Sequence, residues 1–242
     1  MKTLIVTGAS SGIGRAVALR FLQGGWTVGL VARRKEPLHG LADGHPAAHV
    51  LPCDVTDPAA VDAVFASFVA THGHLDGLFN NAGIFTPAAP IDEVPVQDWL
   101  DAVNVNLTGM FLCARAAFGQ MRHQTPQGGR IINNGSVSAH TPREGSVTYT
   151  TTKHGVTGLT KTLALDGRAY NIACGQIDIG NAETPLLRGI ADRAVADGKA
   201  PPPMMEVSLV ADAVWQMMAL PLHANTLFQT IMATQMPFVG RG

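Results

Sequence analysis

The chain has 242 residues, of which 46% are hydrophobic and only 14% are charged, and its formal net charge at pH 7 is −1. This length and apolar content suit one α/β domain, 1–242, with a sizeable core. A net charge near zero offers no basic field to nucleic acid, and no apolar run approaches the ~18 residues of a membrane span. We therefore expect neither a nucleic-acid partner nor a membrane anchor.

Three cysteines, Cys53, Cys113 and Cys174, lie far apart and form no CxxC pair, which favours a reducing compartment. The sequence enters a glycine-rich segment almost at once, without a secretory leader, so we expect a cytoplasmic protein. The nine histidines are scattered, and we expect no metal site.

Short apolar runs alternate with longer amphipathic ones along the chain. Strands are predicted at 3–7, 26–32, 47–53, 75–80, 129–136, 170–177 and 226–234. Helices are predicted at 13–23, 57–71, 96–123, 149–167 and 206–219. This alternation predicts a doubly wound, Rossmann-type parallel sheet of about seven strands with helices on both faces.

Residues 178–205 show no clear periodicity and include three consecutive prolines at 201–203. A long structureless segment in a compact domain is usually disordered or functional. We expect 181–205 to form a substrate lid near the carboxyl ends of the strands, where ligands bind in such sheets.

The segment "TGASSGIG" at 7–14 lies between the first predicted strand and helix. Gly8 permits a turn, Gly12 permits close approach of a pyrophosphate, and Gly14 permits close helix–strand packing. A helix N-terminus offers unpaired N–H groups to phosphate, so this loop predicts dinucleotide binding. A tight connection without a ligand is the alternative. The other loop residues expected to bind the cofactor are Ser10, Ser11 and Ile13.

The Gly-x-x-x-Gly-x-Gly spacing resembles that of the short-chain dehydrogenase/reductase family, in its single-domain branch. "CDVTD" at 53–57 matches the turn that contacts adenine in the family, and "NNAG" at 80–83 matches a segment beside the cofactor ribose. The resemblance continues through "NVNLTGMF" at 104–111 and the segment 134–161. It implies cofactor contacts by Asp54, Val55, Asn81, Ala82 and Gly83, and a catalytic role for Asn106.

Tyr149 and Lys153 are four residues apart in a predicted helix, so their side chains share a face. Tyrosine alone is a weak base at neutral pH, and a nearby cation lowers its pKa. We expect Tyr149 to exchange a proton with the substrate oxygen, Ser136 to bind that oxygen, and Lys153 to lower the tyrosine pKa and hold the ribose. The resemblance implies that Asn106 holds a water linked to Lys153. A solvated helix face is the alternative for the Tyr149–Lys153 pair, and Ser138 is a less well spaced candidate than Ser136.

The sequence departs from the family after the sixth strand, where Ile179 replaces a proline while Gly180 and Thr184 are kept. The resemblance places Thr184 at the nicotinamide carboxamide, and Ile179 could pair with it through its backbone. The second strand ends in Arg33 and Arg34, where NAD-specific folds usually have an acidic residue. Guanidinium groups suit the 2′-phosphate, so NADP(H) is expected in preference to NAD(H). A solvated basic loop is the alternative.

Apolar side chains of the expected lid favour a small, apolar ketone, aldehyde or secondary alcohol as substrate. They are Leu186, Leu187 and Ile190, closed by Met204 and Met205. The segment 138–147 is expected to form the opposite wall, where His140, Arg143 and Glu144 either bind a polar group or are solvated. The predicted function is an NADP(H)-dependent oxidoreductase. A nicotinamide-binding redox sensor without turnover, or an NAD-preferring alcohol dehydrogenase, is the alternative.

The low content of charged residues is compatible with surface buried between subunits. The resemblance implies a homodimer or homotetramer, in which the helices at 96–123 and 149–167 pack against those of a second copy. Apolar residues in these segments that fit such an interface are Met110, Phe111, Phe118 and Val156.

Overall fold

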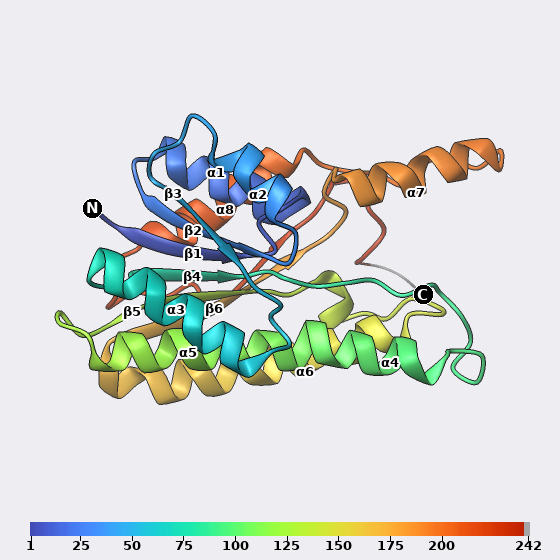
Figure 1. Cartoon of the computed structure of the whole chain (residues 1–242). Helices are drawn as coiled ribbons and strands as arrows, with labels where there is room; N and C mark the ends of the chain where they lie inside the picture. Colours follow the sequence, from blue (N-terminus) through green and yellow to red (C-terminus); the bar gives the residue numbers. More distant parts are fainter. Residues whose placement is uncertain (240–242) are drawn as a thin grey trace.

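The computed structural model describes residues 1–239, so the last three residues of the predicted domain lie outside the description. A parallel sheet of seven strands forms the centre of the molecule (Figure 1), in the order β3-β2-β1-β4-β5-β6-β7. The strands are β1 (Thr3–Thr7), β2 (Thr27–Ala32), β3 (Ala48–Pro52), β4 (Gly77–Asn80), β5 (Gly129–Asn134), β6 (Ile172–Ile179) and β7 (Phe228–Ile231). The strand order reverses between β1 and β4, which confirms the predicted Rossmann-type sheet.

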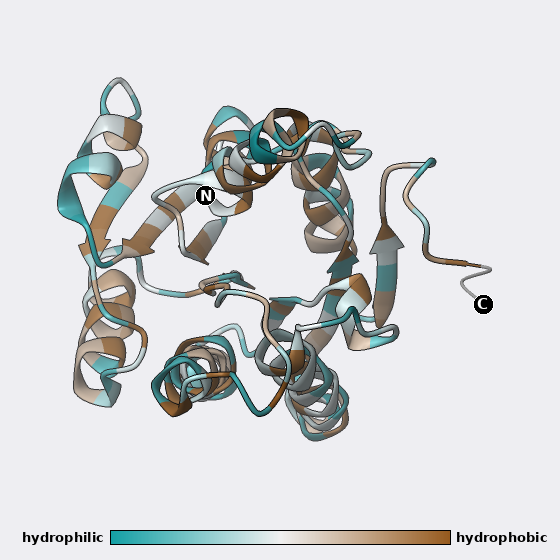
Figure 2. Ribbon diagram, turned by 90° about the vertical axis from the view of Figure 1, so that its right-hand side faces the viewer, coloured by the Kyte–Doolittle hydropathy of each residue, from teal (hydrophilic) through white to brown (hydrophobic). Residues whose placement is uncertain are grey.

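Helices cover both faces of this sheet (Figures 1 and 2), because the strands are apolar on both sides and need a cover on each. One face carries α1 (Gly12–Gln23), α2 (Lys35–Ala42) and α8 (Val207–Ala219). The other carries α3 (Pro58–His72), α5 (Met110–His123) and α6 (Val147–Asp166), with α4 (Val96–Val103) beside α6. α7 (Pro185–Ala196) lies at the periphery of the molecule.

Three helical features differ from the sequence prediction. α2 was not predicted, because eight residues are too few to show a clear period. The predicted helix 96–123 is interrupted by a π-helical turn (Asn104–Gly109). The segment predicted to be irregular contains α7, which begins with Thr184 as a hydrogen-bonding cap and a proline in the first turn.

The start of α3 shows how local sequence sets an element. Asp57 precedes the helix and its carboxylate accepts from the N–H groups of Ala59 and Ala60, while Pro58 occupies the first turn. Gly73 ends the helix in the left-handed conformation, with φ of 84°. Both ends of α3 are thus encoded by neighbouring residues.

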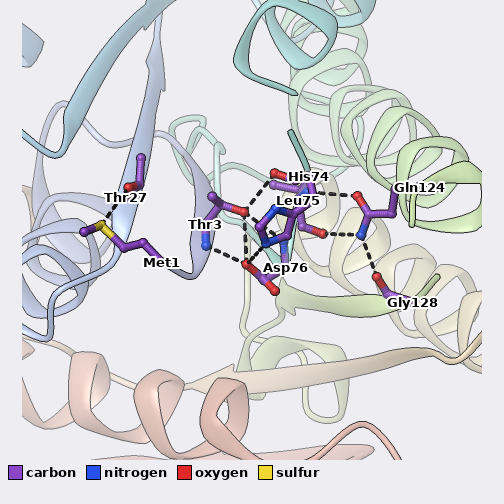
Figure 3. Close-up of polar contacts among 8 residues, drawn as sticks. All are labelled: Met1, Thr3, Thr27, His74, Leu75, Asp76, Gln124 and Gly128. Atoms are coloured by element: carbon purple, nitrogen blue, oxygen red, sulfur yellow. Dashed lines mark hydrogen bonds and ion pairs between the residues drawn. The ribbon is translucent and has the colours of Figure 1, made fainter. Parts of the chain in front are cut away.

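A polar network joins β1 to the segment before β4 at the amino edge of the sheet (Figure 3). The N–H and Oγ1 of Thr3 donate to Asp76 Oδ2 over 2.7 and 3.1 Å, and His74 Nε2 lies 2.9 Å from the same oxygen. Gln124 from the end of α5 bonds both main-chain groups of Leu75, at 2.9 and 3.0 Å. This edge is therefore fixed by side chains, while the carboxyl edge opposite it is left open for a ligand.

The helices α4, α5 and α6 lie together on one side of the molecule (Figure 1). Of the residues predicted to form a subunit interface, Met110 and Val156 are fully buried inside the chain and cannot contribute to one. Phe111 is 49% exposed and is available. In the part of the chain that the structure describes, no helix is long and apolar enough to traverse a lipid bilayer.

Candidate active site

A cavity of about 750 Å³ opens at the carboxyl edge of the sheet, in the region where the strand order reverses. It brings together segments that are far apart in the sequence. The predicted site residues that line it are Gly8, Ser10, Ser11, Gly12, Ile13, Arg33, Arg34, Asp54, Val55, Asn81, Ala82, Gly83, Ser136, Tyr149, Lys153, Ile179 and Thr184. Gly14 and Asn106 support the lining from behind and do not themselves form it.

The glycine loop has the geometry that its sequence predicted. Gly8 and Gly12 have φ of 68° and 53°, in the left-handed region that other residues rarely adopt. A methyl group on Gly14 would overlap the carbonyl oxygen of Gly8 and come within 2.7 Å of Asn81 Nδ2. Asn81 lies behind the loop and donates from Nδ2 to the carbonyl of Thr7 over 2.9 Å. The three glycines therefore allow the loop to close tightly over β1 and Asn81.

The N-terminus of α1 faces this cavity with its N–H groups free of side-chain caps. Ser11 precedes the helix but makes no capping hydrogen bond, and the first turn contains no acidic residue. Ser10, Ser11 and Ile13 line the cavity here. Unpaired N–H groups and the positive end of the helix dipole fit a phosphate, so the loop fits the pyrophosphate of a dinucleotide.

The end of the cavity next to β2 is positively charged. Arg33 and Arg34 are exposed, and neither forms an ion pair within residues 1–239. Asp54 accepts from the N–H and hydroxyl of Thr56, at 3.0 and 2.8 Å. Its pKa is lowered mainly by the Thr56 main-chain bond, with further lowering by the Thr56 hydroxyl and Arg33. This carboxylate is engaged with Thr56, which leaves the two guanidinium groups available to an anion.

The predicted proton-transfer residues meet at the other end of the cavity. Tyr149 and Lys153 come from the first turns of α6, whereas Ser136 follows β5, which ends two residues earlier than predicted. Lys153 Nζ donates to the carbonyl of Asn134 over 2.7 Å and lies 5.4 Å from the centre of the Tyr149 ring. Ser136 Oγ accepts from the N–H of Ser138 over 3.1 Å, so Ser138 shapes the turn that presents Ser136.

Burial dominates the proton affinities of this group. It raises the pKa of Tyr149 to about 12, against a lowering by the Ser136 hydrogen bond, and it lowers the pKa of Lys153 to about 8. Lys153 is not among the groups that shift the tyrosine pKa in the chain without a cofactor, so its lowering of that pKa beside a bound nicotinamide stays a prediction. Its ammonium bonds to a main-chain carbonyl, and loss of water around the phenol outweighs the remaining effects.

Asn106 lies in the π-helical turn and is fully buried. Its Oδ1 accepts from the N–H of Ile84 over 2.7 Å, and its Nδ2 donates to the carbonyl of Ile84 over 2.9 Å. A π-helical turn at this point is a frequent feature of functional sites. In this structure the Asn106 amide fixes the segment after β4, next to Gly83.

The exit from β6 is regular despite the missing proline. Ile179 is the last residue of β6 and pairs with Ile231 of β7, and the N–H of Gly180 donates to Ile231 over 2.8 Å. Thr184 Oγ1 accepts from the N–H of Leu187 over 3.3 Å as the cap of α7. The side chain of Thr184 also packs against Gly12, which brings the start of the predicted lid to the glycine loop.

The apolar part of the cavity includes residues that sequence reasoning missed. Phe85 stacks on Tyr149, with ring centres 4.2 Å apart and planes 20° apart, and Met236 enters from the C-terminal segment. The predicted residues Leu186, Leu187, Ile190 and Arg143 also line it. Met204, Met205, His140 and Glu144 do not; Met205 forms a bridge with Ala182 at the base of the 181–205 segment. No sequence period marks Phe85, because it lies in a loop.

No three His, Cys, Asp or Glu side chains between residues 1 and 239 are grouped so that they could hold a metal ion. The three cysteines are free and buried.

Comparison with known proteins agrees with this geometry. The model of the short chain dehydrogenase family matches residues 2–194. The chain is 34% identical over 221 residues to a 3beta-hydroxysteroid dehydrogenase of Mediterraneibacter gnavus, covering 87% of this chain and 79% of the relative.

Two solved structures are similar over almost their whole length. A 3-ketoacyl-(acyl-carrier-protein) reductase from Brucella melitensis complexed with NADH has a TM-score of 0.86 at 26% identity, covering 96% of this chain and 97% of that one. A closed form of serine dehydrogenase complexed with NADP+ has a TM-score of 0.87 at 28% identity, covering 99% and 98%. The chain therefore belongs to the short-chain dehydrogenase family of oxidoreductases, whose members act on alcohol and carbonyl groups.

Proposed function

We propose that the chain is an NADP(H)-dependent oxidoreductase that interconverts a small apolar ketone or aldehyde and the corresponding alcohol, with Tyr149 as general acid and base. One observation supports this most strongly. One cavity has the uncapped N-terminus of α1 and two arginines without an ion pair in residues 1–239 on one side, and Ser136, Tyr149 and Lys153 on the other. The family membership and the NADH and NADP+ complexes of similar structures support a nicotinamide cofactor.

The glycine loop would hold the pyrophosphate, while Asp54, Val55, Asn81, Ala82 and Gly83 would contact the adenosine and ribose groups. Lys153 would hold ribose hydroxyls, and Ile179 and Thr184 would lie at the nicotinamide. A bound nicotinamide supplies or accepts a hydride. The chain must therefore orient the substrate carbon, bind its oxygen and move one proton.

Ser136 and Tyr149 would share the substrate oxygen. In reduction, negative charge develops on this oxygen, where the Ser136 hydroxyl donates a hydrogen bond and the Tyr149 hydroxyl delivers the proton. With a raised pKa, Tyr149 carries this proton at neutral pH, as the reduction step requires. Oxidation needs the phenolate, so its rate should rise toward alkaline pH. Asn106 would support a water relay to Lys153, as the family resemblance implies.

The wall around Tyr149 supports an apolar substrate. Phe85, Leu186 and Ile190 line the cavity although each keeps at least 43% of its surface exposed. Large apolar groups left open beside a reactive centre are typical of sites that bind apolar molecules. The similarity to a 3beta-hydroxysteroid dehydrogenase supports an apolar secondary alcohol or ketone, without bearing on its size.

Arg33 and Arg34 support a preference for NADP(H). A hydrogen bond to a charged group contributes roughly 1.5–3 kcal/mol, about ten- to a hundredfold in affinity. The double variant Arg33→Asp, Arg34→Ala should therefore reverse the ratio of kcat/KM for NADPH and NADH. A wild-type enzyme that already prefers NADH would contradict this assignment.

The segment 181–205 is proposed as a lid on one domain comprising 1–242. The base of this segment is closed by the Ala182–Met205 bridge and by a hydrogen bond of 2.8 Å from the N–H of Glu183 to the carbonyl of Met205. α7 lies in the sequence between these two ends.

A homodimer or homotetramer formed through α4, α5 and α6 is also proposed, with Phe111 exposed for contact. A monomer by sedimentation at micromolar concentration would refute the oligomer. A cytoplasmic location completes the proposal.

The test of the catalytic assignment is Tyr149→Phe, assayed with NADPH and a panel of cyclic and linear ketones. Because the variant lacks the transferable proton, turnover should fall about 10²- to 10⁴-fold while the NADPH dissociation constant changes little. Lys153→Ala should impair both. Retained turnover in Tyr149→Phe would refute the mechanism. A wild-type protein that binds NADPH but reduces no carbonyl compound would favour a redox sensor.

A further inference from the structure

Asp178, one residue before the end of β6, is a fully buried carboxylate that the mechanism above does not use. Its Oδ1 accepts from the N–H of Ser136 over 3.0 Å and from Gln176 Nε2 over 2.7 Å. Its Oδ2 lies 2.8 Å from His140 Nε2. Burying a carboxylate costs free energy unless hydrogen bonds and charge pairing compensate for its lost water. These three contacts therefore stabilise the buried carboxylate of Asp178.

The neighbouring backbone is built around this carboxylate. A methyl group on Gly135 would overlap Asp178 Oδ1, so a residue with a side chain there would prevent the carboxylate from reaching the Ser136 N–H. Ser136 itself has extended backbone, with φ of −170°, and begins a turn of 3-10 helix (Val137–Ala139). Gly135 and Asp178 together set where the chain turns after β5.

Gln176 extends the network to α6. Its Oε1 accepts from Thr160 Oγ1 over 3.0 Å, and its Nε2 donates to Thr157 Oγ1 over 3.0 Å as well as to Asp178. α6 is the helix that bears Tyr149 and Lys153. A continuous chain of hydrogen bonds thus joins the helix of the tyrosine to the main chain of the serine.

His140 connects the buried carboxylate to solvent, because 43% of its side chain is exposed while that of Asp178 is wholly buried. The titratable and charged groups around this point are Tyr149 and Lys153 on α6, and His140 and Arg143 after β5. The negative charge of Asp178 raises the pKa of both Tyr149 and Lys153, whereas Arg143 lowers that of Tyr149. The carboxylate therefore favours the protonated tyrosine.

We propose that Asp178, paired with His140, is a positioning residue of the active site. It fixes the Ser136 main chain relative to Tyr149 and keeps a negative charge beside the proton-transfer groups. The proposal rests on the roles given to Ser136 and Tyr149 in the proposed function. Its consequence is that the pH dependence of alcohol oxidation, which needs the phenolate, should change when the charge of Asp178 is removed.

The first variant is Asp178→Asn, which keeps the size of the side chain and an acceptor for Ser136 N–H but removes the charge. Loss of a nearby negative charge favours the phenolate, so the acid limb of kcat/KM for alcohol oxidation should move to lower pH by about half a unit or more. Asp178→Ala also removes the acceptor, and kcat should fall about tenfold or more while the NADPH dissociation constant stays within about threefold.

His140 is tested by two variants. In His140→Gln the side-chain amide can still donate to Asp178 Oδ2, so kcat should remain within about threefold of wild type. In His140→Leu that oxygen loses its partner, so kcat should fall further. Equal kcat in the two variants would remove His140 from the proposal.

The chain contains a matched control. Asp76 and His74 form a similar but partly exposed pair, with 2.9 Å between Oδ2 and Nε2 (Figure 3), and neither residue lines the cavity. Asp76→Asn should change the stability without moving the pH profile. An unmoved profile in Asp178→Asn, or a loss of activity in Asp178→Ala that only follows the fraction of folded protein, overturns the proposal. Because wild type and Tyr149→Phe are assayed alongside, a failure of the proposed function would be seen separately.

Discussion

The buried lysine of the active site should make the protein less stable at neutral pH than a variant without it. Lys153 is 4% exposed, and burial lowers its pKa from 10.5 to about 8. Between these two pH values the unfolded chain binds a proton at this position that the folded chain does not. The free energy of unfolding of the wild type therefore rises with pH in this window.

The size of the effect follows from the shift. About 2.5 pH units at 1.36 kcal/mol per unit correspond to about 3 kcal/mol, which is the extra cost of the charged lysine in the folded state below pH 8. Lys153→Met has no such proton. The difference in unfolding free energy, variant minus wild type, should fall by about 2–3 kcal/mol between pH 7 and pH 10. The hydrogen bond to Asn134 is stronger from the ammonium than from the neutral amine, and this difference is already contained in the folded-state pKa of Lys153.

The assay is urea denaturation of the two proteins without cofactor at several pH values, and only the difference between them is interpreted. Lys161→Met on the same helix is the control, because Lys161 is exposed. Its difference from wild type should be nearly independent of pH. A Lys153→Met difference that is flat from pH 7 to pH 10 would refute the reasoning, because Lys153 would then titrate as it does in the unfolded chain.

Further variants test the packing of the site and of the surrounding fold. Gly14→Ala should lower stability by about 1–3 kcal/mol, because its methyl group would overlap the glycine loop. Gly119→Ala, in a helix where nothing lies within 4 Å, should raise stability by about 0.5–1 kcal/mol; both are measured by urea denaturation, and equal signs would contradict this. Arg130→Met should cost about 3 kcal/mol or more, because the buried guanidinium donates to three carbonyls after α8, and an unchanged urea midpoint would exclude that role. Phe85→Ala should lower kcat/KM for a cyclic ketone about tenfold with unchanged NADPH affinity, as expected for a lost aromatic contact. Ile91→Ala, 74% exposed and outside the cavity, is its control, and similar losses in both would refute the assigned wall.

Local sequence was enough to predict the strands and the glycine loop. Each strand is a short apolar run. The pattern of hydrophobic residues that marks such a run depends only on residues that are neighbours along the chain. The three glycines were predictable for the same reason, since a backbone that requires positive φ at Gly8 and Gly12 excludes most other residues. The shared face of Tyr149 and Lys153 follows from helix geometry alone.

Sequence reasoning was weaker where short helices and buried charge are concerned. α7 was predicted to be irregular, because its exposed apolar residues face a cavity and show no core-facing stripe. The pKa of Tyr149 was expected to follow its cationic neighbour. In the folded chain it follows the loss of water around the ring, which no spacing in the sequence reveals.

The sequence by itself determined the fold class and which residues lie at the carboxyl edge of the sheet, because the carboxyl ends of parallel strands all lie at one edge. Only the tertiary structure decided what lies between them. Phe85 meets Tyr149 across 64 positions, and Asp178 meets Ser136 across 42, because β6 pairs with β5. Such contacts depend on the strand order and on the path of the loops. Both arise from the packing of the whole chain, so the local sequence contains no pattern that predicts these contacts.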